Sequence, residues 1–131
     1  MKRSTRNAVK TKQEIIEKSA SVFNVYGYAG TKMQMLVEAT GFQMGGIYRH
    51  FGTKMDLAKA AFLHSYEVQI KANFVLTEEL NPQEQVLHIF QNYKKMALKP
   101  LIPGGCPILN TAIEVDDTDE EFRLLAKGCY E

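Results

Sequence analysis

The chain has 131 residues, 45% of them hydrophobic, which suits one medium domain or two small helical modules. No apolar run reaches the ~18 residues that a membrane-spanning helix needs, and no signal-peptide core follows the basic N-terminus. These features predict a cytoplasmic protein that does not use a membrane as partner.

The net charge of +1 conceals an uneven distribution along the chain. Residues 1–60 carry ten Lys/Arg and four Asp/Glu, a net of +6, whereas residues 61–131 carry six and eleven, a net of −5. This split favours a first half that meets a polyanion, the alternative being a chance distribution of solvated charges.

The first predicted helix follows a flexible basic arm over residues 1–9. It runs from about Lys10 to Tyr26, with Ile16, Ala20 and Phe23 on one stripe at helical spacing. Two glycines, at positions 27 and 30, are expected to end it.

Two short helices joined by a tight turn come next. Thr31 to Gln34 fits a capping box, with the threonine hydroxyl at the N-cap, and opens a helix to Thr40. Gly41 supplies the turn, and a second helix covers about Gln43 to Arg49. These are the proportions of a helix-turn-helix, in which the second helix enters the DNA major groove and the first crosses the backbone.

The second half is also predicted to be helical. Thr53 caps a long helix to about Leu76, and Asn81-Pro82 starts another. The inner stripe of the latter helix is expected to be Val86, Phe90, Tyr93 and Ala97.

A loop rich in proline and glycine, residues 100–105, precedes the last two predicted helices. One runs from Cys106-Pro107 to about Val115, and the other begins near Thr118 after an acidic turn over residues 116–119. No alternating strand pattern is present, so the predicted fold is all-α.

Cysteine and histidine give no sign of a metal site. The two cysteines and three histidines lack the CxxC or HExxH spacing of metal ligands, so neither a metal nor a cofactor is expected. An enzyme using Cys106 with His64 or His88 as nucleophile and base is the alternative, but no phosphate loop, nucleophile elbow or third orienting residue accompanies them. The sequence therefore predicts a protein that is not an enzyme.

An ordered series of residues resembles the tetracycline-repressor (TetR) family of bacterial regulators. The series is Gly27-Tyr28, Thr31, Ala39-Thr40-Gly41-Phe42, Gly45-Gly46-Ile47-Tyr48-Arg49-His50-Phe51, Lys54 and Leu57. The likeness continues more loosely through Gly105-Cys106-Pro107. It implies a three-helix DNA-binding domain over residues 1–52, a long connecting helix, and a helical ligand-binding and dimerisation domain over residues 53–131.

The resemblance implies a DNA-binding role for ten residues. Thr31 would bond a phosphate through its hydroxyl and backbone N–H, with Lys32 beside it. Phosphate contacts position such a protein, whereas base contacts select the sequence. The expected contacts to the backbone near the second helix come from Tyr48, Arg49, His50 and Lys54, and those at the reading end from Gln43, Met44, Gly45 and Gly46.

Two of these positions depart from the family pattern. A small hydroxyl residue is usual where this chain has Gln43, and a polar residue where it has Met44. Gln can bond adenine through two hydrogen bonds, and Met can pack on a thymine methyl. The departures leave the DNA sequence that is read open.

The implied function is a repressor that binds a double-stranded DNA operator as a homodimer and is released by a small molecule. Residues expected to line the ligand pocket are Phe62, Tyr66, Phe90, Tyr93, Met96 and Cys106. Their alternative is ordinary core packing. Cys106, next to a helix N-terminus, also raises the hypothesis of a thiol-based sensor, against that of a buried small side chain.

The final residues end inside a helical pattern, which is compatible with a C-terminal truncation. Family members pair mainly through two C-terminal helices. A second hypothesis is therefore a truncated regulator that acts as an interaction module with an intact partner.

Overall fold

The computed structural model describes residues 2–71, 73–74, 78–115 and 119–129. These residues form helices and connecting turns with no strand, as the sequence predicts. Within this part of the chain, no helix combines the length and apolar character needed to cross a membrane. In chain order the elements are α1 (Lys2–Gly30), α2 (Met33–Thr40), α3 (Met44–His50), α4 (Lys54–Ser65), the π-helical η1 (Tyr66–Lys71), α5 (Pro82–Leu98), α6 (Pro107–Val115) and α7 (Glu120–Gly128).

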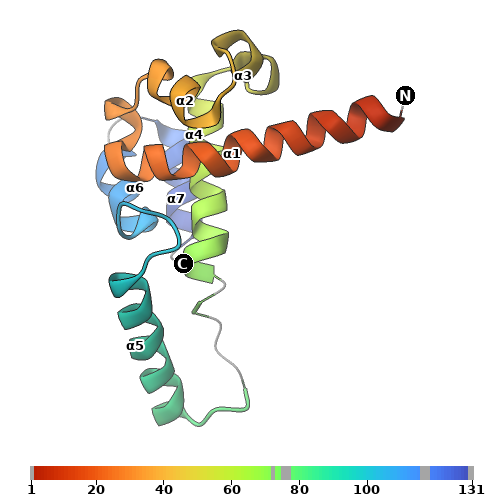
Figure 1. Cartoon of the computed structure of the whole chain (residues 1–131). Helices are drawn as coiled ribbons and strands as arrows, with labels where there is room; N and C mark the ends of the chain where they lie inside the picture. The colour runs from red at the N-terminus through yellow and green to blue at the C-terminus, as the bar shows by residue number, and fades with distance from the viewer. Residues whose placement is uncertain (1, 72, 75–77, 116–118, 130–131) are drawn as a thin grey trace.

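Helix α1 begins at Lys2, so the prediction of a flexible arm over residues 1–9 is wrong for the described residues. Residues 2–26 contain no glycine or proline to interrupt the helix, and Lys18 pairs with Glu14 one turn away at 2.7 Å. The helical geometry breaks at Gly27, where φ is 73°. Figure 1 shows the first part of α1 projecting beyond the body of the molecule.

The first four helices share one hydrophobic core. Its buried side chains come from each of them: Ile15, Leu36, Ile47, Phe51 and Leu57. Figure 1 shows α2 and α3 together at one end of the molecule, with α1 crossing α4 beneath them. This core fixes the position of the two short helices.

Helix α4 begins as predicted. The Thr53 hydroxyl accepts a hydrogen bond from the Asp56 backbone N–H at 3.0 Å, and the Asp56 carboxylate accepts one from the Thr53 N–H at 3.0 Å. The helix becomes π-helical at Tyr66 and ends at Lys71, short of the predicted end at Leu76, which lies outside the described residues. The wider π turn carries Gln69, whose buried amide bonds to the loop before α6.

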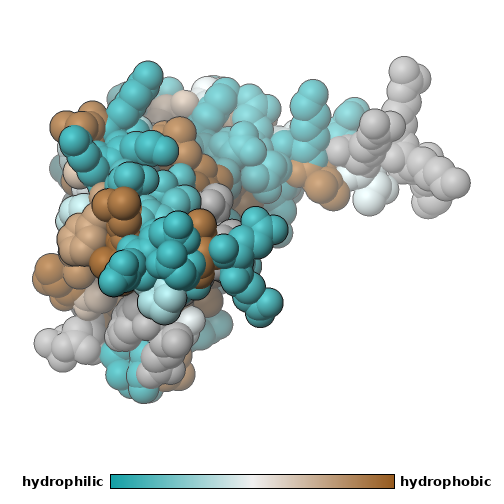
Figure 2. Space-filling model, turned by 90° about the horizontal axis from the view of Figure 1, so that it is seen from below, coloured by the Kyte–Doolittle hydropathy of each residue, from teal (hydrophilic) through white to brown (hydrophobic). Residues whose placement is uncertain are grey.

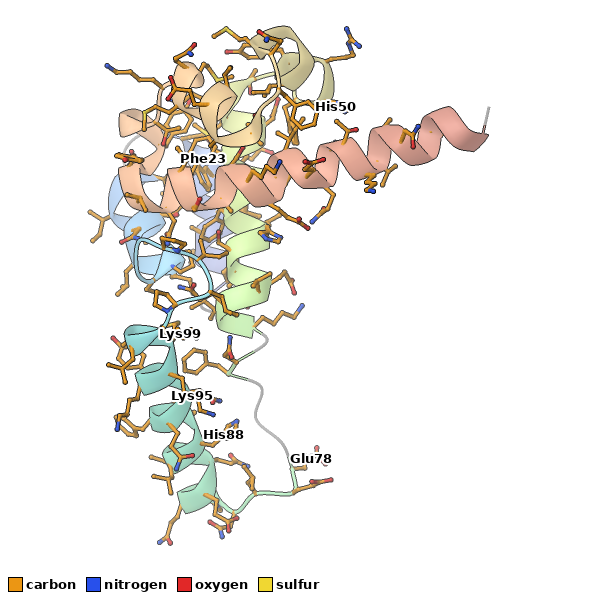
Figure 3. All side chains as sticks on the ribbon, in the orientation of Figure 1. Phe23, His50, Glu78, His88, Lys95 and Lys99 are labelled. Carbon is orange, nitrogen blue, oxygen red and sulfur yellow. The ribbon has the colours of Figure 1, made fainter. Side chains whose placement is uncertain are left out.

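A second core joins α4 to α6 and α7. Its buried side chains are Ala58, Phe62, Val115, Phe122 and Ala126, and the rings of Phe62 and Phe122 meet edge-to-face at 5.7 Å. Phe23 of α1, labelled in Figure 3, packs against this core, against the first one, and against a smaller cluster of Ala20, Ala61 and Ile102.

Helix α5 starts where the sequence predicts, since the Asn81 side-chain oxygen accepts a hydrogen bond from the Glu84 backbone N–H at 3.0 Å. The predicted inner stripe is wrong, because α5 buries no residue: Phe90 is 68% exposed and Tyr93 56%, and Val86 and Ala97 are exposed too. The helix points away from the other helices (Figure 1), and brown hydrophobic side chains reach the surface seen from below (Figure 2). Helical periodicity identified an apolar face but not what covers it.

The last two helices lie close to their predicted positions. α6 starts at Pro107, directly after Cys106, and ends at Val115 as expected. α7 is capped by Asp119, whose side chain accepts the Phe122 N–H at 2.6 Å. The predicted start at Thr118 and the rest of the acidic turn, residues 116–118, lie outside the described residues.

Candidate nucleic-acid interface

The turn between α2 and α3 is fixed by local hydrogen bonds. Gly41 adopts a left-handed conformation, with φ 76°, and its N–H donates to the Val37 carbonyl at 2.9 Å. The Thr40 hydroxyl donates to the Leu36 carbonyl at 2.7 Å and accepts the Phe42 N–H at 3.2 Å. Because Leu36 and Thr40 are buried, the turn is rigidly attached to the core.

Helix α3 turns one side chain inward and leaves its first turn exposed. Ile47 is 1% exposed, whereas Gln43, Met44, Tyr48 and Arg49 are all on the surface. Gln43 stands at the N-cap with extended backbone and makes no capping hydrogen bond, so its amide remains available to a ligand. This is the arrangement that a groove-reading helix requires.

The two glycines of α3 are not required by packing. A Cβ added at Gly45 or Gly46 would meet nothing within 4 Å. Glycine costs about 1 kcal/mol relative to alanine inside a helix. The open surface above them instead permits close approach of another molecule to the backbone.

Lysine, arginine and histidine side chains surround this surface. Lys32 at the N-cap of α2 and Arg49 on α3 are exposed, and His50, at the end of α3 in Figure 3, is half-buried. Lys54, the first residue of α4, is half-buried, with its ammonium 4.4 Å from the centre of the Tyr28 ring. Burial lowers the pKa of Lys54, and the charge of Glu114 acts in the opposite direction.

Thr31 does not have the position that the sequence predicts. Lys32, not Thr31, is the N-cap of α2, and the Thr31 side chain is fully buried. Its hydroxyl donates to the Gly27 carbonyl at 2.6 Å, and its backbone N–H donates to the same oxygen at 3.1 Å. The expected phosphate contact and the capping box with Gln34 are therefore wrong, because both donors of Thr31 already bond to Gly27 in the last turn of α1.

We expect Thr31→Val to destabilise the fold by about 0.5–1.5 kcal/mol, since it removes one buried hydrogen bond and keeps the shape. Under the DNA-binding role that the resemblance implies, Thr31→Val should keep DNA affinity within twofold, while Lys32→Ala, at an exposed neighbour, should weaken binding. Urea unfolding and a fluorescence binding titration measure the two effects. A tenfold loss of affinity in Thr31→Val at unchanged stability would restore Thr31 as a phosphate ligand.

The structure does not bring the six expected pocket residues together. Phe90 and Tyr93 are exposed on α5, and Met96 borders a separate surface hollow beside η1. Tyr66 and the free thiol of Cys106 are half-buried. Only Phe62 lines the cavity that lies between α1, α4, α6 and α7, so the remaining assignments are wrong for this cavity.

This cavity has a volume of about 30 Å³, which is room for one or two waters. Its polar lining comes from Asn24 on α1, Ser65 on α4, and Asn110, Thr111 and Glu114 on α6. Sequence reasoning missed the α6 residues. The available signal was their spacing, since positions 110, 111 and 114 share one face of an otherwise apolar helix.

Amide side chains join the start of α6 to α1. Asn24 donates to the carbonyls of Pro103 (2.8 Å) and Gly105 (3.0 Å), and Asn110 donates to Gly104 (2.7 Å) and to the Asn24 carbonyl (3.2 Å). Gly104, with φ 108°, lies directly on the α1 backbone, because a Cβ there would be 2.6 Å from the Asn24 carbonyl oxygen.

One turn further along α6, Glu114 contacts the turn that leads to α2. Its two carboxylate oxygens accept the backbone N–H groups of Tyr28 and Ala29, each at 2.6 Å. A Cβ on Gly27 would lie 2.8 Å from Glu114, so glycine leaves room for this approach. Among the described residues, no group of three His, Cys, Asp or Glu side chains is placed to hold a metal ion.

Two sequence families match this chain. "Bacterial regulatory proteins, tetR family" matches residues 15–61, and "Tetracyclin repressor-like, C-terminal domain" matches residues 82–131. An uncharacterized HTH-type transcriptional regulator of Bacillus subtilis is 31% identical over 112 residues, covering 82% of this chain and 56% of that protein. The HTH-type transcriptional repressor AcnR of Corynebacterium glutamicum is 43% identical over 47 residues, 36% of this chain and 25% of the repressor.

Solved structures agree with these matches. A TetR transcriptional regulator from Chloroflexus aurantiacus superposes with a TM-score of 0.85 at 37% identity, over 95% of this chain and 63% of its own. A TetR-family regulator from Cytophaga hutchinsonii gives 0.76 at 37% identity, over 94% and 62%. The chain thus spans about 56–63% of the length of the Bacillus, Chloroflexus and Cytophaga proteins. The chain belongs to the TetR family of bacterial regulatory proteins.

Proposed function

We propose that this chain is a DNA-binding transcriptional regulator that reads the major groove with α3. The observation that carries the proposal is the exposed first turn of α3, with Gln43 and Met44 outward, anchored by the buried Ile47. Lys32 and Arg49 supply exposed cations beside it, in the half of the chain with a net charge of +6. We propose that the protein has a regulatory role and not an enzymatic one. We also propose that it acts in the cytoplasm, where bacterial DNA is located.

The assignment divides the surface into two kinds of contact. Gln43 and Met44 face base edges, and Gly45 and Gly46 admit the close approach. The cations Lys32, Arg49 and Lys54, with Tyr48 and His50, contact phosphates and fix the register. A pair of chains reads two half-sites about 34–36 Å apart, one helical turn of DNA, which is the reason to propose a homodimer.

We further propose that the regulator is a repressor released by a small molecule that enters between α1 and α6. The cavity there combines the aromatic rings of Phe62 and Phe122 with the polar groups of Asn110 and Glu114. At about 30 Å³ it is far smaller than the ~300 Å³ of a typical ligand site. Ligand entry therefore requires α6 to separate from α1.

Selection of bound duplexes from a randomised library tests the function. Enrichment of two copies of one half-site at a spacing of about 10 base pairs, with light scattering showing two chains per duplex, is the expected result. Failure to enrich any sequence at low salt would overturn the assignment. Enrichment of a single half-site would retain DNA reading and reject the dimer.

We expect Arg49→Ala to weaken binding to the selected duplex and to reduce the slope of log affinity against log salt by about one, because one phosphate contact is lost. Arg123→Ala is the matched control: Arg123 lies on α7 and pairs with Glu120 at 2.7 Å, away from α3. Fluorescence anisotropy between 50 and 300 mM salt (roughly the range in which such slopes are linear) gives both slopes. Equal slopes in the two variants would show that Arg49 makes no phosphate contact.

A further inference from the structure

We propose that Glu114 of α6 is a positioning residue that holds the last turn of α1, residues 27–30, and makes the position of the helix-turn-helix depend on where α6 lies. This inference rests on the proposed DNA-binding function and adds a route of regulation to it. It names one side chain through which a change in the cavity reaches the DNA-facing end.

The contact uses both oxygens of one carboxylate and joins residues 86 and 85 positions apart in the sequence. Both carboxylate oxygens of Glu114 are used, one on the N–H of Tyr28 and one on that of Ala29, at 2.6 Å each. Charge-assisted hydrogen bonds of this length are about twice as strong as neutral ones. The two amides lie in the last turn of α1, after the kink at Gly27 and shortly before the start of α2.

The same turn leads directly to the DNA-facing surface. Gly27 accepts both donors of the buried Thr31, which precedes the α2 N-cap. The ring of Tyr28 lies under the Lys54 ammonium at the start of α4. Displacement of the turn therefore moves both the start of α2 and the ring against which the Lys54 ammonium lies.

The other side of Glu114 faces the cavity. Glu114 lines it together with Asn110 and Thr111 of α6 and Asn24 of α1. A ligand larger than one or two waters has to separate α6 from α1, because the cavity is only about 30 Å³. Separation lengthens the two bonds to Tyr28 and Ala29, so occupancy of the cavity and release of the turn are the same motion.

Backbone amide exchange tests the contact without DNA or ligand. In Glu114→Ala, the amides of Tyr28 and Ala29 should exchange about tenfold faster or more, because each loses a charged acceptor. Glu114→Gln keeps one acceptor oxygen, so its effect should be smaller. Glu120→Gln removes the same charge from an exposed site on α7 and should leave both amides unchanged.

The titration of Lys54, followed by NMR of its side chain, supplies a readout that a purely structural role would not move. Glu114→Gln should lower the pKa of the Lys54 ammonium further, because the carboxylate charge that raises it is gone. Glu120→Gln should leave the pKa of Lys54 unchanged. Unchanged exchange at Tyr28 and Ala29, or an unchanged Lys54 titration, overturns the inference.

A double-mutant cycle tests the dependence on α6. Thr111→Leu overfills the cavity from α6 and should speed exchange at Tyr28 and Ala29 in the otherwise unchanged chain. In the Glu114→Ala background it should add nothing, since the connection is already broken. Additive effects contradict the route through Glu114. Neither the amide-exchange measurements nor the Lys54 titration uses DNA. If they show the expected effects of Glu114 but the protein selects no DNA sequence, only the proposed DNA-binding function is contradicted.

Discussion

Truncation of Ile47 to alanine is expected to lower the free energy of unfolding by about 2–5 kcal/mol, because it opens a cavity in a closely packed site. Ile47 is 1% exposed and packs in one core with Leu36 and Leu57. It is the buried side chain of α3, so the same change loosens the helix proposed to read DNA. Affinity for the selected duplex should therefore fall even under conditions where the variant remains folded.

The control for Ile47→Ala is the same substitution at Ile113, on α6. Ile113 is 82% exposed, so its truncation should change stability by no more than about 0.5 kcal/mol. Urea unfolding followed by circular dichroism compares the two, and binding is measured at a temperature where both are folded. Equal stability of the two variants would mean that α3 is not anchored through Ile47.

Gly104→Ala is expected to be the most damaging of the glycine substitutions. Its φ of 108° is unfavourable for any side chain, and the new Cβ would lie 2.6 Å from the Asn24 carbonyl oxygen and 2.8 Å from the Val25 nitrogen. Neither neighbour is a flexible side chain, so the loop itself has to shift away from α1. We expect a loss of about 3 kcal/mol or more, from backbone strain of about 1–3 kcal/mol plus the cost of the clash.

Gly105→Ala separates these two causes. Gly105 also has a positive φ, 88°, but an added Cβ would meet nothing within 4 Å. Its loss of stability should therefore reflect backbone strain alone, about 1–3 kcal/mol. The difference between the two variants in urea unfolding measures the steric part. If Gly105→Ala proves as damaging as Gly104→Ala, the close approach of the loop to α1 is not what requires glycine at position 104.

Local capping signals predicted two helix starts correctly and one wrongly. The caps at Thr53 and Asn81 need only a side chain and a backbone N–H three residues later, and both were predicted and found. Thr31 satisfies the same local pattern, but the Gly27 carbonyl takes its donors. The break at Gly27, with its positive φ, was predicted, but its carbonyl as the acceptor for both donors of Thr31 was not.

Tertiary features were predictable only in part. The apolar face of α5 was correctly recognised as apolar, but no described element covers Phe90 or Tyr93. The lining of the cavity was missed because it depends on α6 lying against α1, a contact between residues about 86 positions apart in sequence. Asn110, Thr111 and Glu114, which share one face of an otherwise apolar segment, were the local trace of that contact.

Phe23 belongs to no single part of the molecule, since it touches all three hydrophobic clusters. A side chain shared in this way makes the clusters thermodynamically interdependent, because melting either of the larger ones removes packing from the other. The helices that carry the helix-turn-helix and those that enclose the cavity should accordingly lose their structure in one cooperative transition. Any excised fragment ending before α4 would expose the side of Phe23 that packs on Ala58, Phe62 and their neighbours, and would lose part of the free energy that keeps α3 in place.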